Sequence, residues 1–252
     1  MSISFWPEDI DGAVSLSFDD GAPTQLENAI PLLDDHGFQG TFYVVPDRRP
    51  TWPDLLPRWQ EACRNGHEMG NHTSQHPCSC NFGFRDDGYC LENLTLADIE
   101  QTIDEATEAL DRDFPAQKGN RSFAYPCYQS DVGVGINRQS YIPLVARRLR
   151  CGRGWGERAN NPRAIDLAYV WAWAVQGNTG EEMVDFVEDA MGQGFWAIIC
   201  MHGVGGDHIA IETDALRRLV EHLDANRERI WTHTVIGVAD HIIQRRAEFA
   251  ET

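Results

Sequence analysis

The sequence predicts an α/β protein built as a barrel of about seven parallel strands. Short apolar runs alternate with amphipathic stretches along all 252 residues, and this strand-then-helix rhythm favours parallel strands joined by crossover helices. About seven such units in a chain of this length fit a barrel better than an open sheet. Because no linker, repeat or shift in composition interrupts the rhythm, we expect a single domain over residues 1–252.

The strands are predicted where apolar and β-branched residues form short runs. In chain order the predicted strands are Ala13–Phe18, Gly40–Val45, Glu68–Asn71, Ser122–Tyr125, Leu167–Ala174, Phe195–Met201 and Thr232–Ile236. Two further segments, Pro77–Asn93 and the glycine-rich Cys151–Gly156, are interpreted as loops that decorate the rim of the barrel.

The helices are predicted where apolar residues recur at helical spacing between these strands. In chain order they are Thr24–His36, Asp54–Asn65, Leu96–Asp111, Tyr141–Leu149, Gly180–Gly192, Thr213–Arg229 and Val238–Phe249. We expect Thr24, Thr95 and Thr213 to cap helix N-termini and Gly37 to follow a helix C-terminus.

The charge of the chain excludes some partners. A formal net charge of −18 disfavours nucleic acid, because phosphate binding needs clustered Lys and Arg.

No stretch approaches the roughly 20 apolar residues of a membrane span. Residues 1–11 lack the basic and apolar regions of a signal peptide. We therefore expect a cytoplasmic protein, although a secreted or periplasmic chain trimmed of its signal would look the same. The oligomeric state stays open.

The seven cysteines are an odd number, which excludes a framework in which every cysteine is paired. We expect Cys63, Cys127, Cys151 and Cys200, which lie in apolar or strand-like contexts, to be core thiols. Cys78, Cys80 and Cys90 cluster in one loop. A disulfide or a second metal site there is the alternative to unpaired thiols, and we favour the unpaired state because the loop lacks Cys-x-x-Cys spacing.

Two short motifs carry the ligands of a metal site. Asp19 and Asp20 end the first strand, and two carboxylates in one cleft repel each other unless one of them binds a cation. His72 and His76 follow the third strand at a spacing that lets both hold one ion. Taken alone, Asp-Asp-Gly is also an ordinary turn sequence and a single His-x-x-x-His occurs on surface helices. Together the motifs predict metal-assisted hydrolysis.

The chemistry-bearing residues follow different strands, and in a parallel barrel such positions meet on one face. They are Asp19 and Asp20 after the first strand, His72 and His76 after the third, Cys127 after the fourth and His202 after the sixth. We therefore expect all of them to line one cleft.

The motifs resemble those of the polysaccharide deacetylases, the NodB homology domains of carbohydrate esterase family 4. Ser-Phe-Asp-Asp-Gly at 17–21 and His-Thr-Ser-Gln-His at 72–76 resemble the first two family motifs. Phe-Ala-Tyr-Pro-Cys at 123–127 and Ile-Ile-Cys-Met-His-Gly at 198–203 resemble two later ones. Their order matches the family's, and the resemblance implies a distorted, NodB-like (β/α) barrel.

The resemblance also implies a role for each matched residue. Asp19 would be the general base, while Asp20, His72 and His76 would bind one divalent metal ion, with zinc favoured and cobalt, nickel or manganese as alternatives. The backbone N–H near Cys127 would stabilise the oxyanion. His202 would protonate the leaving group. Apart from the resemblance, His208 in the loop after His202 is a competing candidate for this role, and we favour His202 because it ends the strand.

One position departs from the family pattern. The family motif carries an arginine that steers the base, whereas this chain has Ala124 there. Arg153, flanked by glycines, is our candidate for the missing group, and a surface arginine in a turn is the alternative reading.

The implied function is a metal-dependent hydrolase that removes acetyl groups, N- or O-linked, from a carbohydrate or polysaccharide. The alternatives are an amidohydrolase acting on a small non-sugar amide and a non-catalytic sugar-binding module. Trp155, Trp171 and Trp173 are candidates for a wall on which sugar rings stack. For at least one of Trp171 and Trp173, core packing is the favoured alternative. The substrate stays open among chitin-type, peptidoglycan, xylan and other acetylated carbohydrates.

Overall fold

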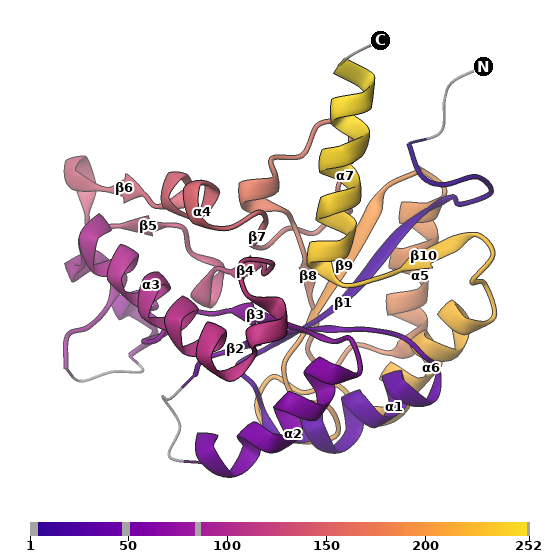
Figure 1. The fold of residues 1–252 in the computed structure, drawn as a ribbon, viewed down its shortest axis with the longest axis horizontal. Coiled ribbons are helices and arrows are strands. Elements are labelled where there is room, and N and C mark those ends of the chain that lie inside the picture. The colour runs from indigo at the N-terminus through magenta and orange to yellow at the C-terminus, as the bar shows by residue number, and fades with distance from the viewer. Residues whose placement is uncertain (1–4, 47–50, 84–86, 251–252) are drawn as a thin grey trace.

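The computed structural model describes residues 5–46, 51–83 and 87–250. Within them one curled sheet of parallel strands is surrounded by helices (Figure 1). Its strands run in the order β7-β4-β3-β2-β1-β9-β8, and β10 pairs with the first half of β1. Their bounds are β1 Gly12–Asp19, β2 Thr41–Val44, β3 Glu68–Asn71, β4 Phe123–Ala124, β7 Gly152–Arg153, β8 Trp173–Ala174, β9 Trp196–Met201 and β10 Ile230–Thr232. A separate antiparallel ribbon joins β5 Asp131–Val132 to β6 Gln139–Ser140.

Hydrogen bonds bring the two ends of the sheet order together. Val170, which precedes β8, forms a parallel bridge with Arg153 of β7. The Gly154 N–H donates to the Val170 carbonyl at 2.8 Å, and the Val170 N–H donates to the Gly152 carbonyl at 2.7 Å. The predicted class, a distorted barrel of parallel strands, is therefore confirmed.

The helices lie close to their predicted ranges. They are α1 Ile30–Asp35, α2 Trp52–Arg64, α3 Leu96–Asp113, α4 Ile142–Arg148, α5 Gly180–Met191, α6 Thr213–Asp224 and α7 Val235–Ala250. A π-helical turn, Gln25–Ala29, runs directly into α1. No helix in the described ranges has the length and apolar character needed to span a bilayer.

The capping predictions had mixed outcomes. Thr95 caps α3 in a reciprocal capping box with Asp98, as expected, and Gly37 has the left-handed φ of 64° that follows a helix end. Thr213 does not cap α6, because it is the first residue inside the helix. Thr24 caps nothing either: its hydroxyl accepts the Val204 N–H instead, at 3.2 Å.

One loop prediction and two strand predictions need correction. The segment Cys151–Gly156 is not a rim decoration, because its residues Gly152–Arg153 form β7. The last strand ends at Thr232, because the Thr234 hydroxyl accepts the Gly237 N–H at 3.2 Å and starts α7. Within 167–174 only Trp173–Ala174 form a strand, because Asp166 accepts the Ala168 N–H and begins a 3-10 turn.

The cysteine predictions are wrong for four residues. Disulfides join Cys78 to Cys127 and Cys80 to Cys90. Cys78 lies beyond β3 and Cys127 beyond β4, and these neighbouring strands are parallel, so both loops leave the same edge of the sheet. The spacing of the cysteines in the sequence does not indicate that these two loops lie side by side. Cys151 and Cys200 are buried free thiols as expected, and Cys63 is a half-buried free thiol.

Glu68 is a buried carboxylate that ties several elements together. It accepts the Ser122 N–H at 2.7 Å and the Ser122 hydroxyl at 2.6 Å. Its other oxygen accepts the Thr41 hydroxyl at 2.9 Å and the Ile236 N–H at 3.0 Å. Burial raises the pKa of Glu68, and these hydrogen bonds act against that rise. One side chain thus joins β2, β3, the start of α7 and the chain leading into β4.

Replacing Glu68 with alanine should lower the free energy of unfolding by about 3 kcal/mol or more, because buried donors on three elements lose their acceptor. Urea unfolding measures the loss. The matched control is Glu108→Ala on the exposed face of α3, expected to change stability by about 0.5 kcal/mol or less. A loss below about 1 kcal/mol in Glu68→Ala would contradict the structural role of this carboxylate.

The disulfide pattern predicts the number of reactive thiols. In denaturant without reductant three cysteines should react with a thiol reagent, namely Cys63, Cys151 and Cys200, and after reduction all seven should react. Peptide mapping under non-reducing conditions should link Cys78 to Cys127. Seven reactive thiols in protein purified without reductant, or a Cys78–Cys80 link, would be inconsistent with this pairing.

Candidate metal and catalytic site

The site residues gather at the carboxyl ends of the parallel strands. Asp19 is the last residue of β1, Arg153 the last of β7, and His72 and His202 directly follow β3 and β9. Strands β9 and β2 flank the second half of β1. The face expected from the sequence is therefore one continuous edge of the sheet.

Asp20, His72 and His76 converge on one point. The Asp20 Oδ1 atom lies 3.2 Å from His76 Nε2 and 3.6 Å from His72 Nε2. With metal–ligand bonds of about 2.0–2.1 Å, two ligands of a tetrahedral ion stand about 3.3 Å apart. The three donor atoms lie within 4.8 Å of one another, so this donor set fits one divalent cation.

The tautomer of His72 also suits the binding of a cation. Its Nδ1–H donates to the Ala124 carbonyl at 2.8 Å, which leaves the lone pair of Nε2 facing Asp20. Such a second hydrogen bond is the usual way to fix the orientation of a metal-binding histidine. Burial acts to raise the pKa of Asp20, but hydrogen bonds from the surrounding histidines bring that pKa well below its ordinary value. Asp20 is thus an anion in this cluster.

The backbone around these ligands is sharply turned. Asp20, Thr73 and His76 have positive φ angles of 70°, 61° and 48°, a conformation that costs non-glycine residues free energy. Side chains hold the turn: Asn71 Oδ1 accepts the Thr73 N–H at 2.8 Å, and the Thr73 hydroxyl accepts the His76 N–H at 2.8 Å. The two histidines are therefore brought together by a side-chain-bonded corner and not by a turn of helix.

Asp19 has different partners from its neighbour. Its Oδ1 atom contacts Arg153 Nη2 directly, and its Oδ2 atom accepts the Cys200 S–H at 3.5 Å. The imidazole Nε2 of His202 lies 4.0 Å from Oδ2. Burial acts to raise the pKa of Asp19, but the charge of Arg153 leads the opposing effects, and the pKa lies below its ordinary value.

Arg153 is fully buried, which excludes the alternative of a surface arginine in a turn. Its guanidinium lies over the rings of Tyr43 and Tyr128, at 5.0 and 5.5 Å from their centroids. In the pairing of β4 with β7, Arg153 stands opposite Ala124. The chain thus supplies an arginine to Asp19 from the strand beside the position where the family motif would carry one.

His202 and His208 lie next to each other but contact different members of the acidic pair. His202 is buried, and burial lowers its pKa. His208 is half-exposed and its Nε2 lies 2.7 Å from Asp20 Oδ2. The two rings meet edge to face with centroids 5.5 Å apart.

Sequence reasoning missed one residue that links the strand ends. The Gln25 side-chain amide donates to the Asp19 carbonyl at 2.6 Å and to the His202 carbonyl at 2.9 Å. Gln25 is fully buried in the turn before α1. The sequence offered one indication of this role, a glutamine on the apolar face of a predicted helix. A glutamine near the start of a helix is also common at the protein surface, so the indication was weak.

The loop at Cys127 is tightly wound beside the ligands. Cys127 and Tyr128 have positive φ angles of 50° and 59°, and the Tyr128 N–H already donates to the Tyr125 carbonyl at 2.9 Å. The Cys78–Cys127 disulfide ties this loop to the segment that carries His76, whose Nδ1 lies 3.6 Å from Cys78 Sγ.

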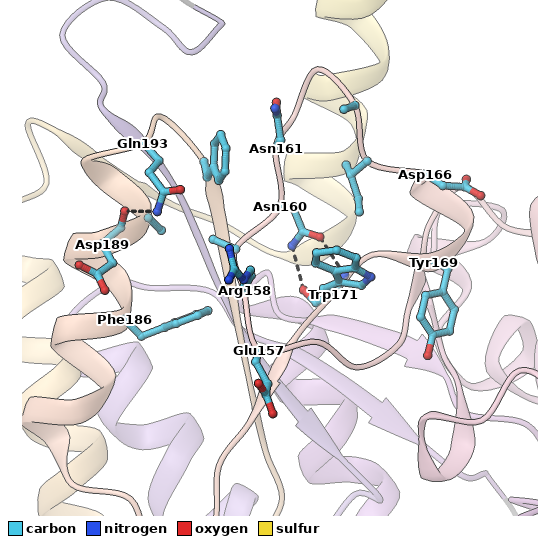
Figure 2. A pocket seen from close by; sticks show the side chains of 15 residues that line it. Glu157, Arg158, Asn160, Asn161, Asp166, Tyr169, Trp171, Phe186, Asp189 and Gln193 are labelled. Carbon is cyan, nitrogen blue, oxygen red and sulfur yellow. Dashed lines mark hydrogen bonds between the residues drawn. The ribbon is translucent and has the colours of Figure 1, made fainter.

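Two of the tryptophans proposed as a sugar wall, Trp171 and Trp173, have different surroundings. A cavity of about 700 Å³ lies between residues 157–171 and the end of α5, and Trp171 and Phe186 line it (Figure 2). Trp173 instead packs against Phe186, with ring centroids 5.0 Å apart. The cavity is lined by none of the predicted catalytic or metal-binding residues.

Two curated proteins are similar to this chain in sequence, one over a short segment and the other over most of the chain. The chain is 33% identical over 64 residues to a peptidoglycan-N-acetylglucosamine deacetylase of Bacillus cereus, an alignment that covers 25% of this chain and 29% of that protein. It is 22% identical over 254 residues to a gellan lyase of a Bacillus species, which covers 91% of this chain and 9% of that protein. The chain therefore spans less than a third of the length of these curated relatives.

Solved structures show the same fold. A family 4 acetyl xylan esterase from Clostridium thermocellum, in complex with a cobalt ion, superposes with a TM-score of 0.55 at 17% identity, covering 88% of each chain. The peptidoglycan deacetylase PdaC from Bacillus subtilis superposes with a TM-score of 0.56 at 18% identity, covering 95% of each chain.

The family itself is identified by the sequence match. The model of the polysaccharide deacetylase family aligns with residues 8–134, which include the acidic pair, both histidines and the Cys127 loop. This match covers half of the chain, and the curled parallel sheet agrees with it. The chain belongs to the polysaccharide deacetylase family.

Proposed function

We propose that this protein is a metal-dependent hydrolase that removes N- or O-linked acetyl groups from a carbohydrate or polysaccharide. The observation that carries the proposal is the separation of two adjacent carboxylates. Asp20 faces a pair of histidines at ligand spacing, whereas Asp19 is held by a buried arginine. A site that only bound sugar would not require a second, separately held carboxylate.

Asp20, His72 and His76 would hold the cation, with zinc favoured and cobalt, nickel or manganese as alternatives. Three protein ligands leave coordination positions open, as catalytic rather than structural sites do. A divalent cation in such a site lowers the pKa of water and polarises a carbonyl group. The proposal is supported by the spacing of the donors and by the His72 tautomer.

The other residues would move protons and stabilise charge. Asp19, kept ionised by Arg153, would accept the proton of the attacking water as a general base. The amide of Cys127 would donate a hydrogen bond to the oxyanion, since the next amide, that of Tyr128, is bonded to Tyr125. His202 would return a proton to the departing amine or alcohol, since its Nε2 atom lies 4.0 Å from Asp19 Oδ2.

An acetylated carbohydrate is the substrate class that the comparisons favour. The similar proteins named above include a peptidoglycan-N-acetylglucosamine deacetylase and an acetyl xylan esterase, which by their names act on an amide and an ester. A net charge of −18 suits a neutral glycan better than an anionic one.

The disulfides bear on where the protein acts. Two disulfides are typical of oxidising compartments and rare in the cytosol. We therefore propose a secreted or periplasmic location in place of the cytoplasmic one expected from the N-terminal residues.

The direct test measures acetate release from acetylated glycans, and ring opening of cyclic amides by chromatography, with metal-depleted protein reloaded with Zn²⁺, Co²⁺, Ni²⁺ or Mn²⁺. The panel should contain N-acetylated chitooligosaccharides and peptidoglycan fragments, O-acetylated xylan, and small cyclic amides. We expect acetate from at least one acetylated glycan and one bound metal ion per chain. Absence of turnover on every glycan by metal-loaded protein would refute the proposal, and turnover of a cyclic amide alone would favour the amidohydrolase alternative.

The two aspartates predict different mutant phenotypes. Asp19→Asn should retain the metal and lose turnover by about 10²–10⁴-fold, because a general base is removed. His72→Ala should lose both metal and turnover. Elemental analysis and acetate release on the same samples measure the two properties. Metal loss in Asp19→Asn with metal retained in Asp20→Asn would show that the roles of the two aspartates are reversed.

The contact between Arg153 and Asp19 predicts that replacing Arg153 changes the pH dependence of kcat/KM. Burial acts to raise the pKa of Asp19 and Arg153 acts to lower it, so Arg153→Met leaves the burial effect unopposed. The base then takes up a proton at higher pH, and the acid limb of kcat/KM should move upward by about one pH unit or more. Arg153→Lys, which keeps the charge, should shift it less.

The matched control is Arg150→Met. Arg150 lies three residues before Arg153 in the sequence, and it is an exposed arginine that donates to Asn120 and Asp240. Circular dichroism and metal content identify any variant that fails to fold. An acid limb in folded, metal-loaded Arg153→Met that coincides with that of the unsubstituted protein would exclude this role for Arg153.

A further inference from the structure

The two oxygens of Asp20 have different surroundings. Oδ1 faces the Nε2 atoms of His76 and His72, at 3.2 and 3.6 Å. Oδ2 points the other way and lies 2.7 Å from His208 Nε2. A third histidine therefore contacts Asp20, through the oxygen that does not face His72 and His76.

The distances separate two kinds of contact. Two ligands of one tetrahedral ion stand about 3.3 Å apart, and both contacts of Oδ1 are close to that value. A separation of 2.7 Å is too short for two ligands of one ion and is the length of a charge-assisted hydrogen bond. His208 thus suits an N–H donor to Asp20 and not a fourth ligand beside it.

The loop that carries His208 is held in place near the start of the π-helical turn. The Asp207 carboxylate accepts the Thr24 N–H at 3.0 Å, and the Thr24 hydroxyl accepts the Val204 N–H at 3.2 Å. Within the loop, the Gly203 N–H donates to the His208 carbonyl at 3.1 Å. His208 therefore approaches Asp20 from a loop bonded to the chain that follows Asp20 itself.

We propose that His208 is a positioning residue for the metal site. It donates its Nε2–H to Asp20 Oδ2, turns Oδ1 toward His72 and His76, and so prepares the carboxylate for the cation. Partners of this kind behind a metal ligand typically contribute 10–100-fold in metal affinity. This inference rests on the metal site of the proposed function, and it separates His208 from the role of general acid considered for it in the sequence.

Metal affinity tests the inference without reference to turnover. Metal-free protein is titrated with Zn²⁺ in competition with a chromophoric chelator. His208→Ala should raise the Kd for Zn²⁺ by about 10–100-fold. His208→Gln, whose side-chain amide can also donate to Oδ2, should restore most of the loss. His36→Ala is the matched control, because His36 pairs with Asp224 at 3.1 Å in a half-exposed contact outside the site, and it should leave the Kd unchanged.

The visible spectrum of the Co²⁺-loaded protein distinguishes a hydrogen-bonded partner from a ligand. We expect the band positions of His208→Ala to match those of the unsubstituted protein once the metal is saturating. A changed spectrum together with no rescue by His208→Gln would identify His208 as a direct ligand and overturn the inference. An unchanged Kd in His208→Ala would overturn it as well. If the unsubstituted protein binds no Zn²⁺, the proposed function fails first.

Discussion

The arrangement of the site depends on the buried contact between Arg153 and Asp19. In the sheet order β7 lies four strand positions from β1, a separation of about 19 Å in a flat sheet at about 4.8 Å per strand. An arginine side chain cannot span that distance, so the contact exists only because the sheet curls. A buried ion pair is costly unless further contacts satisfy both charges. Tyr43, Tyr128 and Cys200 surround this pair and supply such contacts.

The same contact explains how two neighbouring aspartates differ. Both carboxylates end one strand, yet Asp19 turns into the barrel toward a guanidinium and Asp20, at a φ of 70°, turns out toward the histidines. Neither direction follows from adjacency in the sequence. The arginine opposite Ala124 in the strand register shows how a side chain from a neighbouring strand reaches the place that a family motif fills from within. The proposed chemistry requires a positive charge beside Asp19, and it does not depend on which strand carries the arginine.

The long, strongly patterned elements were predictable. Strands β1 and β9 are apolar runs buried along their whole length, and α3 and α5 combine helical periodicity with capping boxes. The two-residue strand β7 was missed, because two residues carry no periodicity and its backbone joins the sheet only through distant partners. The same reason applies to the disulfides, whose partners Cys78 and Cys127 are 49 residues apart and meet because β3 and β4 are neighbours.

The sequence by itself determined the family, the parallel barrel and the acidic and histidine motifs, because each of these is written in local residue types and their spacing. The tertiary structure alone decided which oxygen faces which partner. It places Arg153 on Asp19, His208 on Asp20 and Gln25 across the ends of β1 and β9. These contacts join residues as far as 188 positions apart. Their physical basis is the curl and register of the sheet, which fix distances between strand ends that no local pattern encodes.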